Sequence, residues 1–382
     1  MTSLSDLPIR DDLRGKSPYG APQKVVPVAL NVNENTHPIP EDVATDIVER
    51  VAHAVLGVNR YPDREFTELR ESLARYLGHG LTAENLWAAN GSNEVIQQIL
   101  QAFGGPGRSL LGFAPTYSMY PLLAAGAGTA YLSGRRDAEF ELSPETAAAE
   151  IRRLDPDIVI LCSPNNPTGT PLSLETIEAA YDAARGMVVV DEAYAEFMPE
   201  GEPSALTLLP GRPRLLVSRT MSKAFAFAGA RVGYLAADPA AVDALRLVRL
   251  PYHLSALTQA AALGALAHSE EMLAMVGEIR DQRDRIVTEL AGLGYRPHRS
   301  GSNFVLFGGV ADPQATFEAL LEQGVLIRDV GIPNHLRVTA GTEAETTAFL
   351  TALASLGRPA SGANAAPDAA ESATDQPVGS QS

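Results

Sequence analysis

Short apolar runs alternate with segments of helical periodicity between residues 86 and 237. The runs are SLLGF, TAYLS, DIVILC, MVVVDE, RLLVS and RVGYLAA. Nearly continuous apolar strands separated by helices are typical of a mostly parallel sheet with helices on both faces. In such sheets the loops at the carboxyl ends of the strands form the ligand crevice. Polar motifs that directly follow these runs are therefore candidates for a functional site.

The rest of the pattern divides the chain. Two amphipathic segments, at 40–58 and 63–80, precede the strands, and from residue 256 a long helical stretch leads into two or three strands with helices. A chain of 382 residues exceeds a single typical core. We predict an N-terminal arm (1–40) that joins the small domain, a large α/β domain (41–255), a smaller α+β domain (256–357) and a disordered tail (358–382) with almost no bulky apolar residue.

Composition narrows the possible classes of protein. Hydrophobic residues make up 45% and charged residues 20%, as in soluble globular proteins. The net charge of −16 disfavours nucleic acid and anionic membranes as partners. Cys162 is the single cysteine, so there is no intrachain disulfide and no thiol cluster for zinc. A charged N-terminus and the lack of a long apolar run predict a cytoplasmic protein that binds neither membrane nor metal.

The stretch RTMSKAFAFAGARVGY, residues 219–234, places Lys223 among hydroxyls, small residues and an arginine. A lysine becomes nucleophilic when burial or a nearby cation lowers its pKa, and Arg231 is a candidate for that cation. Thr220 and Ser222 could close on a phosphate. Together these features suggest a carbonyl cofactor that carries a phosphate, such as pyridoxal 5'-phosphate. The alternative is an ordinary surface lysine in an alanine-rich segment.

Two motifs earlier in the chain fit the same ligand. Gly91, Ser92 and Asn93 precede an apolar helix, where free backbone amides and the positive helix end attract an anion. The alternative is an ordinary Ser or Asn helix cap. Tyr117 follows the strand SLLGF, where its ring could stack on a planar cofactor or belong to the core.

Two further strands end in polar residues. SPNNPTG follows DIVILC and offers Asn166 as a directional hydrogen-bond donor, unless it is a plain turn. Asp191 ends the apolar run MVVVD, where an unpaired carboxylate is costly. A protonated pyridine nitrogen would satisfy it, as would a structural salt bridge. Tyr194, three residues later, could donate to a phenolic oxygen of the cofactor.

In order along the chain, GSNE, PTYSMY, SPNNPTG, DEAY, SKAFAFAGAR and LRVTAGT resemble the fold-type I pyridoxal-phosphate aminotransferases. The resemblance implies that Lys223 bonds covalently to the cofactor and that Asp191 pairs with its pyridine nitrogen. It implies that Asn166 and Tyr194 bond the phenolate oxygen and that Tyr117 stacks on the ring. The phosphate ligands would be Gly91, Ser92, Asn93, Thr220, Ser222 and Arg231. Tyr61, in the turn NRYPD, would reach into the site of the neighbouring subunit of a homodimer.

Within that superfamily LRGKSPYGAP, LNVNEN, NRYPD, LPYHLS, SNFVLF and GVLIRDVG are similar to the histidinol-phosphate aminotransferase family of histidine biosynthesis. The similarity implies that histidinol phosphate and glutamate or 2-oxoglutarate are the substrates. It implies contacts from Tyr19, Asn33, Arg328 and Arg337, with Arg337 also taking a carboxylate of glutamate. Paired arginines suit a dianionic phosphate. The alternatives are an aromatic amino-acid aminotransferase, a decarboxylase of the same fold, and a cofactor-binding regulator without turnover.

Overall fold

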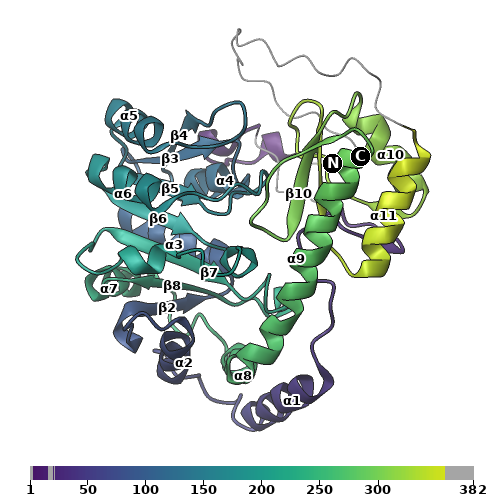
Figure 1. Cartoon of the computed structure of the whole chain (residues 1–382). Coiled ribbons are helices and arrows are strands. Elements are labelled where there is room, and N and C mark those ends of the chain that lie inside the picture. Colours follow the sequence, from purple (N-terminus) through teal and green to yellow (C-terminus); the bar gives the residue numbers. More distant parts are fainter. Residues whose placement is uncertain (1–2, 16–19, 21, 358–382) are drawn as a thin grey trace.

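The computed structural model describes residues 3–15, 20 and 22–357. Figure 1 shows a large sheet flanked by helices, a smaller part around β10, α10 and α11, and the long helix α9 running between the smaller part and α8. The predicted tail, 358–382, and Tyr19 lie outside the described residues.

The large sheet has seven strands in the order β2-β8-β7-β6-β5-β3-β4. Strand β8 runs in the opposite direction to the other six strands, so the sheet is mostly parallel, as predicted. Its strands are β2 (Leu86–Ala89), β3 (Ser109–Ala114), β4 (Ala130–Arg135), β5 (Ile158–Cys162), β6 (Met187–Asp191), β7 (Leu215–Thr220) and β8 (Gly233–Ala237). Each of the six apolar runs forms one of these strands to within two residues at either end.

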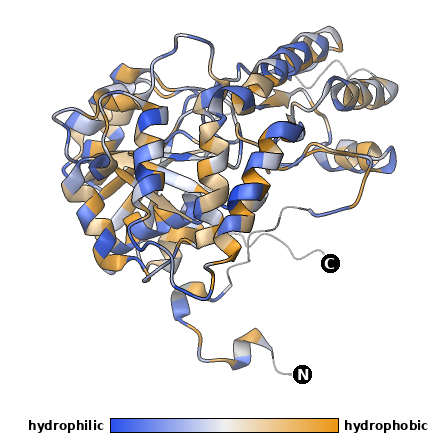
Figure 2. Ribbon diagram, turned by 90° about the horizontal axis from the view of Figure 1, so that it is seen from below, coloured by the Kyte–Doolittle hydropathy of each residue, from blue (hydrophilic) through white to orange (hydrophobic). Residues whose placement is uncertain are grey.

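Helices cover both faces of this sheet. Right-handed connections place α3 and α4 on one face and α5 and α6, which pack side by side, on the other. The helices of this part are α1 (Glu41–Val55), α2 (Thr67–Leu77), α3 (Ser92–Phe103), α4 (Met119–Gly126), α5 (Pro144–Leu154), α6 (Leu174–Ala183), α7 (Pro239–Val248) and α8 (Ala256–Ala267). In Figure 2 hydrophilic and hydrophobic residues alternate along the outer helices, as expected for helices with one buried face.

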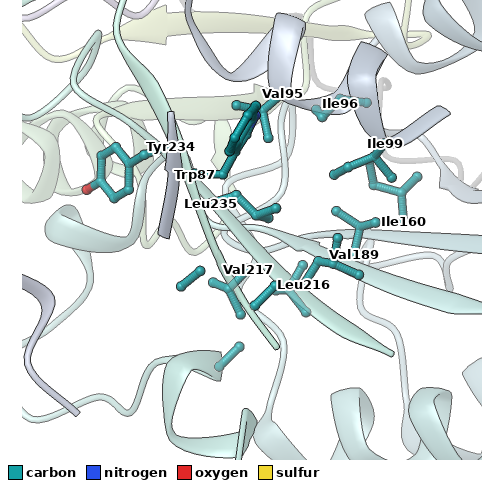
Figure 3. Packing of buried hydrophobic residues seen from close by; sticks show 14 of the residues in the cluster. Trp87, Val95, Ile96, Ile99, Ile160, Val189, Leu216, Val217, Tyr234 and Leu235 are labelled. Carbon is teal, nitrogen blue, oxygen red and sulfur yellow. The ribbon is translucent and has the colours of Figure 1, made fainter. Parts of the chain in front are cut away.

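The core of the sheet forms because its central strands are apolar and buried along their whole length. Val95, Ile96 and Ile99 of α3 point towards the sheet, where Trp87 and Ile160 lie (Figure 3). All five side chains are at most 2% exposed. Because α3 is anchored on this core, its first turn is held at the carboxyl edge of the sheet.

The smaller part is built on a second core. Its three-stranded antiparallel sheet has the order β12-β10-β9, from β9 (Arg296–Pro297), β10 (Phe304–Gly308) and β12 (His335–Thr339). The helices are α9 (Ser269–Gly292), α10 (Pro313–Glu322) and α11 (Glu343–Ser355). The arm joins this part, because β1 (Val28–Ala29) pairs in parallel with β11 (Val325–Leu326).

The two cores meet along α9. The buried residues of α8 and Met272 belong to the first core, whereas Val276 and Ile279 belong to the second. This packing favours a domain division inside α9, and the predicted division at residue 256 stays a prediction.

The described residues also form short 3-10 turns. They are Leu4–Asp6, Asp11–Leu13, Ala83–Asn85, Ala195–Phe197, Ala205–Leu208 and Ala228–Ala230. Within the described ranges, none of the helices combines the length and the apolar composition needed to cross a membrane.

Candidate active site

A pocket opens where the carboxyl ends of the central strands meet the arm and the smaller sheet. Its lining comes from the start of α3, the ends of β5, β6 and β7, the loops after β3, β5, β6 and β7, Arg231 shortly before β8, the arm and β12. The lining residues are Val32, Asn33, Ser92, Asn93, Tyr117, Cys162, Asn166, Asp191, Ala193, Tyr194, Thr220, Ser222, Lys223, Arg231 and Arg337. Twelve of the sixteen residues predicted from the sequence therefore lie around one cavity, although they span more than 300 positions.

Lys223 lies three residues beyond the end of β7, and its amine donates to the carbonyl oxygen of Val32 in the arm at 3.1 Å. Burial lowers the pKa of this amine to about 8, and the positive charge of Arg337 lowers it further than that of Arg231. Arg231, the cation suggested by the sequence, also lowers this pKa, but Arg337, which was not considered for this role, lowers it more. With a pKa near 8, about a tenth of the amine is uncharged at pH 7, far more than for an ordinary lysine, and this uncharged form can act as a nucleophile or base.

Asp191 is 2% exposed and faces the pocket from the end of β6. Its Oδ2 accepts a hydrogen bond from the Tyr120 hydroxyl at 2.8 Å and its Oδ1 accepts one from the Ser218 hydroxyl at 3.1 Å. Burial raises the pKa of this carboxyl group, and the two hydroxyls oppose that shift. Throughout the described part of the chain no lysine, arginine or histidine forms an ion pair with Asp191, so the alternative of a structural salt bridge has no support.

The arm and the smaller sheet bring a hydrogen-bonded group over the pocket. Asn33 and Asn166 both donate from Nδ2 to the hydroxyl oxygen of Tyr194, at 3.0 and 3.4 Å. Arg337 on β12 donates to Oδ1 of Asn166 at 2.6 Å and to the carbonyl of Asn31 at 2.8 Å. The group therefore links the loops after β5 and β6 to the smaller sheet, with four of its side chains at most 9% exposed.

The start of α3 forms a cradle of backbone amides. Gly91, not Ser92 or Asn93, occupies the cap position, and no side chain bonds to the first helical amides, which contradicts the alternative of an ordinary side-chain cap. Gly91 has a φ of +86°, and a Cβ there would lie 2.3 Å from the Arg231 guanidinium. That guanidinium is held by the Ser222 hydroxyl at 3.2 Å and by the Ala228 carbonyl at 3.0 Å. Free amides and a fixed guanidinium around one cavity suit a phosphate.

The cradle depends on close contact between β8 and the turn before α3. A Cβ on Gly233 would lie 2.1 Å from the Ser92 amide nitrogen and 2.2 Å from the Gly91 carbonyl carbon. Both are backbone atoms that cannot rotate away. We expect Gly233→Ala to lower the free energy of unfolding by about 3 kcal/mol because the turn must move. Chemical denaturation will measure it, with Gly126→Ala, where a Cβ meets nothing within 4 Å, as the control. Equal stability of the two variants would contradict this packing.

Two predicted site residues, Tyr61 and Arg328, do not line the pocket, and Gly91 lies just behind it. Tyr61 is 79% exposed, and its ring stacks on Tyr252 with a centroid distance of 4.3 Å. Arg328 is partly exposed and donates to the carbonyl of Gly20 at 3.1 Å, although its backbone pairs with Arg337. Tyr19 lies outside the described residues. The roles that the resemblance implies for these residues stay predictions.

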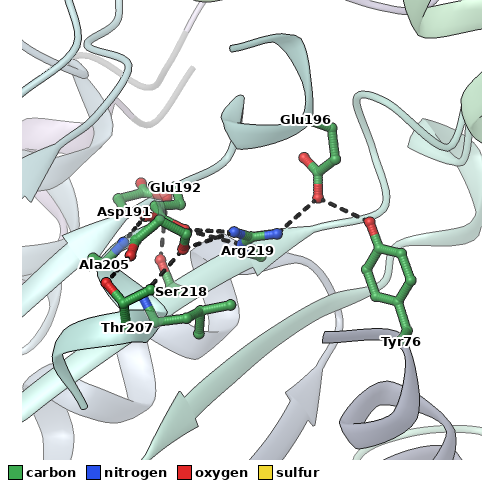
Figure 4. A network of polar contacts seen from close by, with 10 residues as sticks. Tyr76, Asp191, Glu192, Glu196, Ala205, Thr207, Ser218 and Arg219 are labelled. Atoms are coloured by element: carbon green, nitrogen blue, oxygen red, sulfur yellow. Dashed lines mark hydrogen bonds and ion pairs between the residues drawn. The ribbon is translucent and has the colours of Figure 1, made fainter. Parts of the chain in front are cut away.

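A buried charged network lies directly behind Asp191 and was not predicted (Figure 4). Arg219 donates from Nε and Nη2 to Glu192 Oε2 at 3.0 and 2.8 Å and reaches Glu196 at 3.4 Å. Glu196 also accepts from the Tyr76 hydroxyl at 3.3 Å. Asp191 and Ser218 are register partners on β6 and β7, and the residue that follows each of them, Glu192 or Arg219, belongs to this network. Successive side chains of a strand point to opposite faces, so the ion pair fixes both strand ends from behind.

Comparison with known proteins agrees with this geometry. The model of the family "Aminotransferase class I and II" matches residues 26–353. Histidinol-phosphate aminotransferase of Paenarthrobacter aurescens (strain TC1) is 65% identical over 92% of this chain and 96% of its own length. The enzyme of the same name from Thermobifida fusca (strain YX) is 57% identical over 92% and 96%.

Solved structures share the fold. Histidinol-phosphate aminotransferase from Sinorhizobium meliloti in complex with pyridoxal-5'-phosphate has a TM-score of 0.81 at 24% identity, covering 93% of this chain and 100% of that one. Aspartate aminotransferase from Thermus thermophilus with maleate has a TM-score of 0.74 at 26% identity, covering 87% and 92%. The resemblance predicted from the motifs is confirmed: the chain belongs to the aminotransferase class I and II family.

Proposed function

We propose that this protein is a pyridoxal-phosphate-dependent aminotransferase that converts histidinol phosphate and 2-oxoglutarate to imidazole-acetol phosphate and glutamate. The observation that carries the proposal is one pocket that combines Lys223 and Asp191 with a phosphate cradle and with Arg337. The names of the relatives at 57% and 65% identity support the same substrate.

The residues present fit the cofactor in three respects. Asp191 is a buried carboxylate that faces the pocket without an ion-pair partner in the described chain, as a protonated pyridine nitrogen requires. The first amides of α3 have no side-chain cap and lie beside the Arg231 guanidinium, as a phosphate requires. The Lys223 amine, with a pKa of about 8, is available for a bond to an aldehyde.

When bound, the cofactor supplies an electron sink for the carbon that loses its proton. The chain's own residues do the rest. Lys223 takes the proton from the carbon that bears the substrate's amine and returns it during the exchange. Asp191 would keep the ring nitrogen of the cofactor protonated, and Asn166 and Tyr194 would hold its phenolic oxygen. The arm closes the pocket through Asn33 and so limits the access of water.

Substrate specificity would come from the arm and the smaller sheet. Arg337 is buried next to Asn166 and presents a planar guanidinium to the pocket. Such a group recognises a phosphate or a carboxylate through forked hydrogen bonds. We assign Arg337 to both substrates and Arg328, together with Tyr19 and Asn33, to histidinol phosphate.

A homodimer is part of the proposal. Apolar side chains are exposed along α1, in the turn after it, at the end of α7 and at the start of α8. Helices α1 and α8 pack side by side at the bottom of Figure 1. The exposed apolar side chains are Val48, Val55, Leu56, Val58, Leu247, Leu250 and Leu257. The stacked pair Tyr61 and Tyr252 belongs to the same surface. An exposed apolar patch of this kind marks an interaction site, and we propose a second copy of the chain as its occupant. Tyr61 would then enter the partner's pocket.

The cytoplasmic location of the protein stays a prediction.

The proposal is tested by comparing kcat/KM for histidinol phosphate and phenylalanine. We expect histidinol phosphate to be preferred by about 10- to 100-fold, because phenylalanine leaves the phosphate-binding arginines unpaired. Conversion of the bound cofactor's absorbance by histidinol phosphate, without a second substrate, will show the first half of the reaction. Equal or better use of phenylalanine would favour the aromatic aminotransferase, and release of carbon dioxide would favour the decarboxylase.

A further inference from the structure

The hydroxyl of Tyr120 is a buried polar group that the reaction as described so far does not use. Tyr120 lies in the first turn of α4, its side chain is 0% exposed, and it is 71 residues from Asp191 in sequence. Its hydroxyl donates to Oδ2 of Asp191 at 2.8 Å, while Ser218 donates to Oδ1 at 3.1 Å. Each carboxylate oxygen therefore accepts a hydrogen bond from one neutral hydroxyl, and the carboxylate faces the pocket.

The charges around Asp191 make these neutral donors important. Burial raises the pKa of Asp191, and the negative charge of Glu192 raises it as well. The cation behind the site, Arg219, is already paired with Glu192. From β5 the thiol of Cys162 faces the same group, and burial raises its pKa to about 12, so it is uncharged. The groups that favour ionised Asp191 are thus two hydroxyls and one backbone amide.

Of these groups Tyr120 has the strongest effect on the pKa of Asp191. Burial and the charge of Asp191 raise the pKa of Tyr120 itself well above its usual value, so the phenol keeps its proton and always donates. Arg136 is a cation close enough to Tyr120 and Cys162 to interact with both electrostatically, and its guanidinium donates to the carbonyls of Phe113 and Phe140. A donor that never titrates can hold Asp191 as a carboxylate across the whole working pH range.

We propose that Tyr120 is a positioning residue that keeps Asp191 ionised and aims it at the ring nitrogen of the cofactor. This inference rests on the proposed function, because it assumes that pyridoxal phosphate binds in the pocket. It predicts that removing one hydroxyl, in a side chain that touches neither substrate nor cofactor, weakens recognition of the ring nitrogen specifically.

The test compares two ligands on the Tyr120→Phe variant. Pyridoxamine phosphate binds without a covalent bond to Lys223, and its 1-deaza analogue replaces the ring nitrogen with carbon. In the wild-type protein the ratio of their dissociation constants measures the pairing of the nitrogen with Asp191. We expect Tyr120→Phe to lower this preference about tenfold, the worth of one hydrogen bond to a charged group, and to leave the affinity for the 1-deaza analogue within about twofold.

The pH dependence gives a second readout. Loss of the hydroxyl raises the pKa of Asp191, so the preference for the nitrogen-containing ligand should disappear at a higher pH on acidification than in the wild type. Tyr131→Phe removes a hydroxyl from the same sheet without a bond to Asp191 and should change neither the preference nor its pH dependence. Ser218→Ala, which removes the longer bond, should lower the preference in the same direction by a smaller factor.

The outcomes separate the inference from the proposed function. If Tyr120→Phe keeps the wild-type preference for pyridoxamine phosphate over its 1-deaza analogue, the role of Tyr120 is overturned. An equal loss of affinity for both ligands would also overturn it, because general misfolding gives that result. If Tyr120→Phe does not fold, an unchanged preference in Ser218→Ala would overturn the hydroxyl mechanism. If the wild-type protein itself does not distinguish the two ligands, the pairing of Asp191 with the cofactor is wrong, and with it that part of the proposed function.

Discussion

Lys223→Ala should lower kcat by about 10⁴-fold, the upper range for loss of a positioned acid or base. The variant lacks both the group that bonds the cofactor and the group that moves the proton. The absorbance of the lysine-bound cofactor should disappear as well, while cofactor held only by the phosphate cradle and Asp191 remains exchangeable by dialysis. Single-turnover kinetics with histidinol phosphate and the visible absorption spectrum will measure both effects.

The composition of the chain makes the covalent bond easy to locate. The three lysines of the sequence are Lys16, Lys24 and Lys223. Borohydride reduction of the holoenzyme followed by peptide mapping should label Lys223 alone, and Lys24→Ala, an exposed lysine outside the pocket, should behave as wild type. Retention of turnover and of the absorbance band by Lys223→Ala would refute the assignment.

The pH dependence of cofactor binding gives a further test of Lys223. Because the amine attacks only when uncharged, the rate of cofactor incorporation should rise with pH and level off above about 8.

The location of the site was predictable because the carboxyl ends of parallel strands meet at one edge. Once β5, β6 and β7 had been recognised from their apolar runs, Asn166, Asp191 and Lys223 had to lie close together. That inference required only the period of the pattern and the order of the elements. The short distances between these residues also depend on β5, β6 and β7 being neighbours in the sheet, which the structure shows.

The contacts that tune the site were not predictable, because they join residues with no shared local pattern. Tyr120 occurs in an apolar helical segment, where a tyrosine looks like core packing, and only the tertiary structure brings its hydroxyl to Asp191. Arg219 belongs to the recognised motif, yet its side chain points away from the pocket to Glu192 and Glu196. Sequence proximity likewise favoured Arg231 as the cation near Lys223, although the fold brings Arg337 into the stronger position.

Arg337→Ala should lower kcat/KM for histidinol phosphate and for glutamate by about 10³-fold each, since truncating a buried, hydrogen-bonded cation removes the partner of a substrate anion in both half-reactions. Its guanidinium is 2.6 Å from Asn166 Oδ1 and lies over the Phe304 ring, so the geometry it offers to an anion is rigid. Steady-state kinetics with each substrate will measure the two losses separately. An unchanged kcat/KM for either substrate would contradict the shared role.

Arg328→Ala is the matched variant that tests how the two arginines divide the substrates. Arg328 is partly exposed, and its backbone pairs with that of Arg337. Because we assign Arg328 to histidinol phosphate alone, we expect its loss to affect histidinol phosphate but not glutamate.

Arg337→Ala should also have a second effect that a loss of substrate binding alone would not produce. The positive charge of Arg337 lowers the pKa of the Lys223 amine, so its removal should raise that pKa above 8. The pH at which cofactor incorporation levels off must then move upward in Arg337→Ala and stay in place in Arg328→Ala, which ties the substrate-binding arginine to the reactivity of the catalytic lysine.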